Sequence, residues 1–253
     1  MRISVCIPTY NGEKYIRHQL DSILSQISVD DEVVISDDSS TDGTIEIIKG
    51  FRDSRIKLIE GCSFKSPIFN CENALKNAIG EFIILSDQDD IWLPGKVNKT
   101  LEKLLVHDIV VCNSHIVDQD ERIIHDSYFE WKGCGNGFFR NLKKNSYLGC
   151  SLAFNRKILD FVLPFPSGIA MHDIWIGLVS EMIGKTYFLP EPLFLYRRHE
   201  DNFTASIHKA DDQLSDFKLW YKIWYRAELV WYLGVRYFKR RVWKRKNMTP
   251  LQG

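Results

Sequence analysis

The sequence predicts an α/β fold built on a mostly parallel β-sheet. Short apolar runs alternate with segments of helical periodicity over the first 100 residues, and three of these runs end in polar loops. Strands that alternate with helices pair in parallel, because each helix returns the chain to the same edge of the sheet. Ligands of open α/β sheets bind at the carboxyl ends of the strands. We therefore expect the three polar loops to form one site.

Each element follows from a local pattern. Strands are predicted where apolar and β-branched residues run together, and helices where apolar residues recur every three or four positions. In chain order, the predicted strands cover residues 3–7, 32–36, 55–59, 81–85 and 109–112. The predicted helices cover residues 13–26, 42–48, 73–79 and 173–183. Pro8 and the pair Asn11-Gly12 end the first strand, and Gly80 ends the third helix.

The charge of the chain is unevenly distributed. Its 253 residues include 33 Lys and Arg and 33 Asp and Glu, so the formal net charge is zero. Residues 217–246 contain ten basic residues and one acidic residue, a net charge of +9, and the rest of the chain therefore carries −9. Neutrality argues against a protein that binds nucleic acid through bulk basicity. We predict a folded domain over residues 1–210 and a basic, aromatic helical tail over residues 211–253.

The cysteines and the hydropathy indicate a cytoplasmic protein. None of the six cysteines forms a C-x-x-C pair, which favours free thiols in a reducing compartment. No signal peptide and no run of about 18 apolar residues is visible in the sequence.

The tail predicts an amphipathic helix. On a helical wheel one arc is aromatic and apolar, with Phe217, Trp220, Tyr221, Trp224, Tyr225, Trp231, Tyr232, Val235, Phe238 and Val242. The adjacent arc is basic, with Lys218, Lys222, Arg226, Arg236, Arg240 and Lys244. Such a helix suits the surface of an anionic membrane. The alternative is that its aromatic face packs on the domain or on a partner subunit. Glu228 and Gly234 both interrupt the amphipathic pattern.

The strongest local signal is the acidic cluster Asp87, Asp89 and Asp90, directly after the strand at 81–85. Crowded carboxylates repel one another, so they need a cation or a raised pKa. Mg²⁺ or Mn²⁺ would supply that cation through oxygen ligands. The alternative is a solvated turn that caps the next helix, although the apolar run Ile91–Pro94 that follows is typical of an anchored segment.

A second polar cluster covers residues 36–44, again after a strand. Thr41 or Asp42 would serve as the N-cap of the following helix. Capping does not account for the pair Asp37-Asp38, and one of these carboxylates could accept a hydrogen bond from a nucleotide base.

Taken together, four segments resemble the inverting, metal-dependent glycosyltransferases of family 2, which have the GT-A fold. The segments are Pro8–Asn11, Ser36–Thr44, Gly80–Phe82 and Ser86–Trp92, and the resemblance covers about residues 1–202. The sequence Asp-Gln-Asp-Asp-Ile-Trp looks most like that of bacterial polysaccharide and O-antigen hexosyl- and rhamnosyltransferases. Met171–Trp175 resembles the acceptor-side motif of the family.

The resemblance implies roles for individual residues. Nucleotide-sugar contacts fall on Pro8, Thr9, Tyr10, Asn11, Glu13, Asp38, Asp87 and Gln88. The metal ligands are Asp87 and Asp89, and the catalytic base is Asp173, whose alternative role is an N-cap. Contacts to the diphosphate or the acceptor fall on Trp92, His172, Arg197 and His199, with Arg198 less favoured. Many relatives carry an arginine where this chain has Asn70–Leu75, so Lys65 or Lys76 would have to replace it.

The expected activity is transfer of a hexose, with inversion, from UDP-glucose or UDP-galactose. The expected acceptor is a GlcNAc- or GalNAc-type saccharide on undecaprenyl diphosphate, in O-antigen repeat synthesis on the cytoplasmic face of the inner membrane. One alternative is a rhamnosyltransferase that uses dTDP-rhamnose. The alternative from another class is a non-catalytic nucleotide-sugar-binding or receiver-like module. A dehydrogenase is disfavoured, because no G-x-G-x-x-G follows the first strand.

Overall fold

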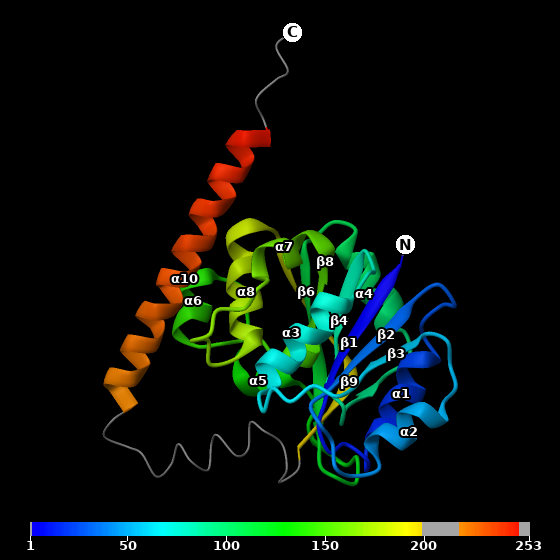
Figure 1. The fold of residues 1–253 in the computed structure, drawn as a ribbon. Coiled ribbons are helices and arrows are strands. Elements are labelled where there is room, and N and C mark those ends of the chain that lie inside the picture. The colour runs from blue at the N-terminus through cyan, green and yellow to red at the C-terminus, as the bar shows by residue number, and fades with distance from the viewer. Residues whose placement is uncertain (1, 199–217, 248–253) are drawn as a thin grey trace.

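A nine-stranded mixed sheet forms the centre of the protein, and helices cover both of its faces (Figure 1). The computed structural model describes residues 2–198 and 218–247, and within the last segment it describes side chains at residues 224–238. The strands are β1 (Ile3–Thr9), β2 (Glu32–Asp37), β3 (Ile56–Ile59), β4 (Phe82–Leu85), β5 (Ile91–Trp92), β6 (Ile109–Val117), β7 (Ile123–His125), β8 (Leu152–Asn155) and β9 (Thr186–Arg197). Their order is β3-β2-β1-β4-β8-β6-β9-β5, and β7 pairs with β6.

The first half of the sheet is parallel, as the alternation of strands and helices predicts. β3, β2, β1 and β4 pair in parallel, whereas β8 runs antiparallel to both β4 and β6. The parallel pairing of β1 with β2 aligns Thr9 with Asp37, so the polar loops after the two strands begin at the same level. The sheet thereby brings the first two predicted loops to one edge.

Two hydrophobic clusters pack on the two faces of the sheet. The helices are α1 (Ile16–Leu24), α2 (Thr44–Gly50), α3 (Pro67–Asn77), α4 (Lys96–Leu104), α5 (Tyr128–Lys132), α6 (Phe138–Lys143), α7 (Leu159–Val162), α8 (His172–Ile183) and α10 (Lys218–Asn247). Short 3₁₀ turns lie at Gly149–Ser151 and Arg156–Ile158. Residues of α1, α2 and α4 belong to one cluster, and residues of α3, α7, α8 and α10 to the other.

Helix α3 begins six residues before the predicted start at residue 73. Ser66 is its N-cap, because the Ser66 hydroxyl accepts from the Phe69 amide at 3.5 Å, and Pro67 occupies the first helical position. Serine at the N-cap and proline at the first position are common helix-start signals. The pair Ser66-Pro67 would have located this start.

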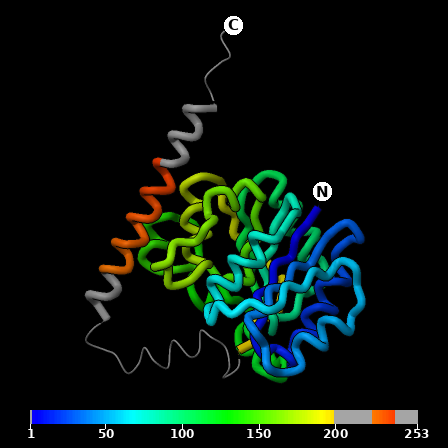
Figure 2. The backbone as a smooth tube through the Cα atoms, in the orientation of Figure 1, coloured from blue at the N-terminus to red at the C-terminus, as the bar shows by residue number. Residues whose placement is uncertain are grey.

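Helix α10 lies along one side of the domain, beside α6 and α8 (Figures 1 and 2). Its packed face carries Leu229 and Leu233, which are 1% and 2% exposed. Arg226 and Arg236 lie on this face as well, and their guanidinium groups donate to backbone carbonyls of the domain, at Leu142, Lys143, Leu163 and Pro164. Two residues of the basic arc, Arg226 and Arg236, therefore contribute packing contacts.

Part of the aromatic side of α10 faces outward. Trp224, Trp231 and Phe238, spaced seven residues apart, are 62%, 70% and 66% exposed. Tyr225 and Tyr232 of the same arc are partly buried and pack on the domain, so the alternative in which the aromatic face packs on the domain holds for these two residues. Glu228 accepts from the Tyr232 hydroxyl and lies against Gly168, so it belongs to the packed side. No helix among the described residues is both long and apolar enough to cross a bilayer.

Candidate active site

The loops after β1 and β2 are locked together by side-chain to backbone hydrogen bonds. Asn11 accepts from the Thr41 amide at 2.8 Å, and its own amide donates to the Ser40 hydroxyl at 2.9 Å. Glu13 accepts from the Gly43 amide at 2.8 Å. Asn11 takes φ +49°, a conformation that asparagine tolerates better than most residues. Asn11 and Glu13, two of the predicted site residues, therefore hold together the loops that form the base of the site.

The loop after β4 is joined to the same floor. Gln88 accepts from the Tyr10 amide at 2.9 Å and donates to the Tyr10 carbonyl at 3.0 Å. The Tyr10 side chain is 55% exposed, so its ring offers a stacking surface. The structure thus brings all three polar loops together at one edge of the sheet, as the sequence predicts.

The two aspartates after β2 stabilise loops from inside the protein. Asp37 accepts from Ser40 and from the buried Thr9 hydroxyl, at 3.1 Å for the latter. Asp38 accepts from three consecutive backbone amides, those of Phe64, Lys65 and Ser66. A carboxylate has about four acceptor positions, so Asp38 keeps one for a ligand. Its loop-ordering role was not evident from the sequence.

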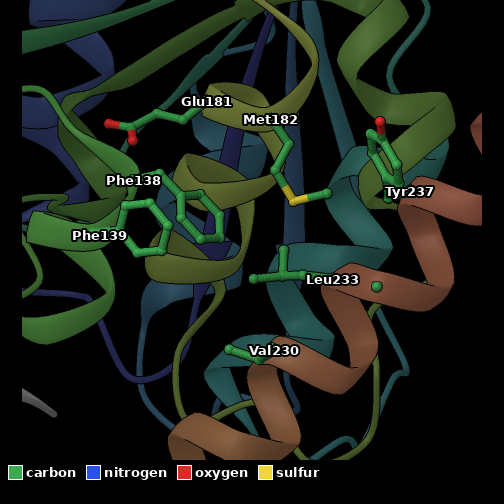
Figure 3. A pocket seen from close by; sticks show the side chains of 8 residues that line it. Phe138, Phe139, Glu181, Met182, Val230, Leu233 and Tyr237 are labelled. Atoms are coloured by element: carbon green, nitrogen blue, oxygen red, sulfur yellow. The ribbon is translucent and has the colours of Figure 1, made fainter.

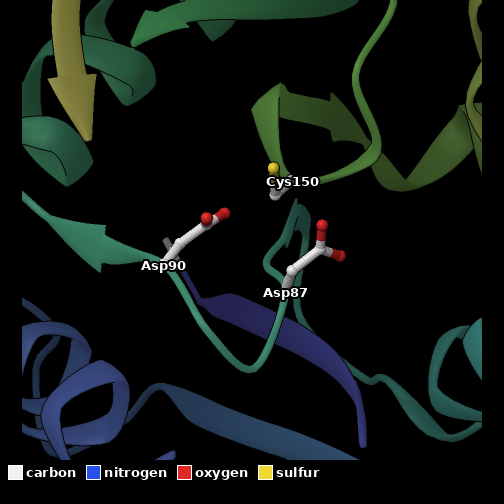
Figure 4. Close-up of side chains that lie close together, drawn as sticks. All are labelled: Asp87, Asp90 and Cys150. Atoms are coloured by element: carbon white, nitrogen blue, oxygen red, sulfur yellow. The ribbon is translucent and has the colours of Figure 1, made fainter. Parts of the chain in front are cut away.

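Asp87 and Asp90 face the Cys150 thiol (Figure 4), and one ligand atom of each lies within 4.8 Å of the others. Burial, followed by the charge of Asp89, raises the pKa of Asp87 to about 7 and raises that of Asp90 well above its usual range. Two carboxylates that repel each other in a poorly solvated position suit a divalent cation. The sequence predicts Asp87 and Asp89 as the two metal ligands. The close group instead contains Asp87, Asp90 and Cys150.

A buried lysine lies next to this acidic group. Lys96 is 1% exposed, and its Nζ lies 4.4 Å from the Trp92 ring centroid and 4.0 Å from that of Phe194. The same atom donates to the Cys150 carbonyl at 3.4 Å. Burial lowers the pKa of Lys96, whereas Asp90 and Asp87 act in the opposite direction. Lys96 was not predicted from the sequence, because two of its partners, Cys150 and Phe194, come from distant segments.

Asp173 lies in the first turn of α8 and is 7% exposed. One carboxylate oxygen accepts from Asn145 at 3.1 Å and the other from the Ile174 amide at 2.6 Å. Burial raises the pKa of Asp173 to about 6, although both hydrogen bonds favour the ionised form. Met171 is the N-cap of this helix, so Asp173 does not serve as the cap. After burial and the charge of Asp89, the charge of Asp173 also contributes to the raised pKa of Asp87.

Three residues predicted on the diphosphate or acceptor side have other surroundings. Trp92 is 3% exposed and packs in the core. Burial lowers the pKa of His172 to about 4, so its ring is neutral at pH 7. Arg197 is 2% exposed, and it donates to the carbonyls of Asp89 and Gln119 and to the Glu121 carboxylate. Arg197 therefore holds the acidic loop in place. His199 lies outside the described residues.

Lys132, Lys144 and Arg198 form a basic cluster. Lys132 Nζ is 3.9 Å and Arg198 Cζ 5.4 Å from the Trp131 ring centroid, and Lys144 Nζ donates to the Lys132 carbonyl at 2.6 Å. Lys144 directly precedes Asn145, the hydrogen-bond partner of Asp173. Among the described residues, no carboxylate forms an ion pair with any of the three bases.

The basic cluster contains cations at positions other than the two lysines expected from the sequence. Lys76, one of the two proposed replacements for the missing arginine, forms an ion pair with Glu72 at 3.0 Å. The backbone amide of Lys65, the other candidate, donates to Asp38. Arg198, less favoured than Arg197 from the sequence, is the arginine that the structure places in the basic cluster.

A family model described as "Glycosyl transferase family 2" matches residues 4–163 of the chain. An Escherichia coli protein, "UDP-Glc:alpha-D-GlcNAc-diphosphoundecaprenol beta-1,3-glucosyltransferase WfaP", is 39% identical over 72% of this chain and 71% of its own length. The "dTDP-rhamnosyl transferase RfbG" of Shigella flexneri is 27% identical over 87% of this chain and 81% of its own length.

Solved structures share the fold. Staphylococcus aureus TarS, solved in complex with UDP-GlcNAc, superposes with a TM-score of 0.65 at 21% identity, covering 91% of this chain and 72% of that one. A mannosyltransferase from Pyrobaculum calidifontis, solved with GDP-Man and Mn²⁺, gives a TM-score of 0.62 at 19% identity, covering 99% of this chain and 76% of that one.

Proposed function

The chain belongs to glycosyltransferase family 2 and has the GT-A fold, and from this we propose that it transfers one hexose, with inversion, from a UDP-sugar to a saccharide on undecaprenyl diphosphate. The observation that carries the proposal is the buried Asp173 carboxylate close to the acidic group of Asp87 and Asp90. Inverting transfer requires a base on the acceptor side and a charge-stabilising group on the leaving-group side.

The chemistry assigned to the chain starts with the acceptor hydroxyl. Asp173 takes the proton of this hydroxyl as its oxygen attacks the anomeric carbon, and the bond from that carbon to the diphosphate breaks on the opposite face. Asn145 holds the Asp173 carboxylate in position through a hydrogen bond of 3.1 Å. Burial of the base excludes water that would otherwise compete as the acceptor. The exposed Tyr10 ring offers a stacking surface for the base of the nucleotide, and Asp38 keeps one acceptor position for its ring N–H.

Asp87, Asp89 and Asp90 fit a divalent cation, Mn²⁺ or Mg²⁺. One oxygen of the buried Asp90 carboxylate, Oδ2, makes no hydrogen bond within the described residues, and burial together with the charge of Asp89 raises the pKa values of Asp87 and Asp90, which supports a cation at this position. Mn²⁺ was present in the related mannosyltransferase structure. When bound, the cation would neutralise charge on the diphosphate of the donor.

The donor and acceptor are proposed from the relatives. The Escherichia coli relative, at 39% identity, is named for a UDP-glucose donor and a GlcNAc-diphosphoundecaprenol acceptor, and the Shigella relative for a dTDP-rhamnosyl donor. UDP-glucose or UDP-galactose is therefore the proposed donor, and dTDP-rhamnose is the second candidate.

A donor panel tests this assignment. UDP-glucose, UDP-galactose, UDP-GlcNAc and dTDP-rhamnose are each incubated with GlcNAc- and GalNAc-diphosphate lipids, and the products are identified by mass spectrometry. We expect turnover with a UDP-hexose, an inverted anomeric configuration and release of UDP. Turnover with dTDP-rhamnose alone would replace the donor assignment, and no transfer from any of the donors would contradict the proposal.

We also propose that α10 holds the enzyme on the cytoplasmic face of the membrane. The exposed stripe of Trp224, Trp231 and Phe238 suits the interfacial region, where aromatic side chains are enriched, and several of the tail's bases follow it in the sequence. Leu229 and Leu233 keep the helix packed on the domain, so replacing the stripe leaves that contact intact.

Replacing the stripe tests the membrane proposal. The variant Trp224→Ser, Trp231→Ser, Phe238→Ser is expected to bind vesicles containing phosphatidylglycerol at least about tenfold more weakly in a sedimentation assay, because three large apolar contacts are lost. Val29→Ser is the control, since Val29 is 86% exposed and lies far from α10 in the sequence. Equal vesicle binding by the triple variant and the wild type would contradict the proposal.

A further inference from the structure

An open apolar groove lies between α6, α8 and α10 (Figure 3), with a volume of about 430 Å³. It is lined by Phe138, Phe139, Glu181, Met182, Val230, Leu233, Gly234 and Tyr237. The Glu181 carboxylate is engaged on the α6 side, where it accepts from Tyr147 at 2.5 Å and from Asn141 at 3.0 Å. The remaining lining is almost wholly apolar, and the groove is open to solvent.

Gly234 leaves space in this groove, although no neighbouring atom requires a glycine at this position. A Cβ at residue 234 would meet no atom within 4 Å, whereas a Cβ at Gly177 on α8 would come within 2.3 Å of Tyr147. Glycine in the middle of a helix costs roughly 1 kcal/mol relative to alanine. The neighbouring chain therefore does not require glycine at 234, and a larger side chain would extend into the groove.

The groove is linked to the active site by α8. Asp173 lies in the first turn of this helix and Met182 near its end, about 14 Å apart along the axis at 1.5 Å per residue. The basic cluster of Lys132, Lys144 and Arg198 adjoins the groove through Lys144. Lys144 follows α6 directly, and Arg226 of α10 donates to the carbonyl of Lys143 at 2.7 Å.

We propose that this route binds the lipid-linked acceptor, with its diphosphate at the basic cluster and the first units of its polyisoprenoid chain in the groove. The inference rests on the proposed function and extends it to residues that hold the acceptor. Three bases near one another, with no carboxylate partner among residues 2–198 and 218–247, suit a diphosphate. An apolar groove beside the exposed stripe of α10 suits a chain that emerges from the membrane.

Filling the groove tests the proposal. Gly234→Leu is expected to raise KM at least about tenfold for a GlcNAc-diphosphate acceptor with an undecaprenyl chain, because the leucine displaces apolar contacts of the chain. With a water-soluble acceptor that carries a short alkyl chain, KM should stay close to the wild-type value. The melting temperature should not fall, since leucine is the better helix former.

Two further variants complete the design. Ala227→Leu is the matched control, because it adds the same bulk at an exposed position of α10 that does not line the groove. Lys132→Gln with Lys144→Gln should raise KM for both acceptors and leave KM for the donor unchanged. A rise in donor KM alone would assign the cluster to the donor diphosphate. It would overturn the proposal that the cluster binds the acceptor diphosphate.

The outcomes separate the two proposals. Equal use of the long-chain acceptor by wild type and Gly234→Leu would overturn the groove proposal, as would an equal loss in Ala227→Leu. Absence of transfer from any donor to the short-chain acceptor by the wild-type enzyme would instead contradict the proposed function.

Discussion

Asp173→Asn is expected to lower kcat by about 10²- to 10⁴-fold, the range that a general base contributes. The amide has nearly the same shape as the carboxylate but cannot take the proton of the acceptor hydroxyl. Because Asp173 is not among the residues that contact the nucleotide in our proposal, UDP should bind to the variant as to the wild type. Transfer is measured by UDP release and binding by calorimetry. Wild-type rates in the variant would remove Asp173 as the base.

The pH profile provides an independent readout of the same residue. Burial raises the pKa of Asp173 to about 6, and only the ionised form accepts a proton. The rate should therefore increase as the pH rises through about 6 and level off above it. Saturating metal is needed in this experiment, because Asp87 without a cation has a pKa of about 7 and would add a second transition.

Loss of this pH dependence in Asp173→Asn would assign the transition to Asp173. Asp160→Asn on α7 is the control, since Asp160 is an exposed aspartate outside the site. Its profile should match that of the wild type. A profile that stays flat between pH 5 and 8 in the wild type would contradict the assignment.

Removal of divalent metal is expected to abolish transfer, and Mn²⁺ or Mg²⁺ should restore it. Asp87, Asp89 and Asp90 repel one another, and their carboxylates would face the diphosphate of the donor without a neutralising charge. A cation that binds only the folded protein also stabilises it, by about 2.7 kcal/mol at a concentration 100 times its Kd. Turnover and melting temperature are measured in excess chelator and after the metal is returned. Full activity in excess chelator would exclude the metal role.

Asp87→Asn separates metal binding from folding. The substitution removes one charge from a repelling group, so the metal-free protein should be as stable as the wild type or more stable. The gain in melting temperature on adding metal should be lost, together with transfer. Asp160→Asn should retain both. A full metal-induced shift in Asp87→Asn would remove Asp87 from the ligand set.

The first hundred residues could be predicted well, because their structure depends on neighbouring residues. Apolar runs at 3–7, 32–36 and 81–85 became β1, β2 and β4, whereas helix boundaries shifted by two to six residues and β5 and α4 were not predicted. β8 and β9 were not predicted. β9 contains Pro190 and Pro192, which disfavour a strand, and it forms because β6 pairs with it across a register shift near Asn113.

The residues of the candidate site likewise divide into those that local motifs predict and those that they do not. Asp87 and Asp173 were predicted from motifs, and the charge of Asp173 contributes to the raised pKa of Asp87. Cys150, Lys96 and the basic cluster were not predicted, because their neighbours lie 50 or more residues away in several cases and carry no shared pattern. Arg197 was predicted as a ligand-side cation, but its donors are used by Asp89, Gln119 and Glu121.

The tail shows where local information ends. Periodicity established that residues 217–246 form an amphipathic helix with aromatic and basic arcs, because helical spacing is a property of the chain alone. It did not establish which arc packs on the domain. Leu229 and Leu233 pack because they fit the surface of α8, and Arg226 and Arg236 reach backbone carbonyls that only the folded domain presents. The exposed stripe and the groove beside it exist because the face with Leu229 and Leu233 packs on the domain.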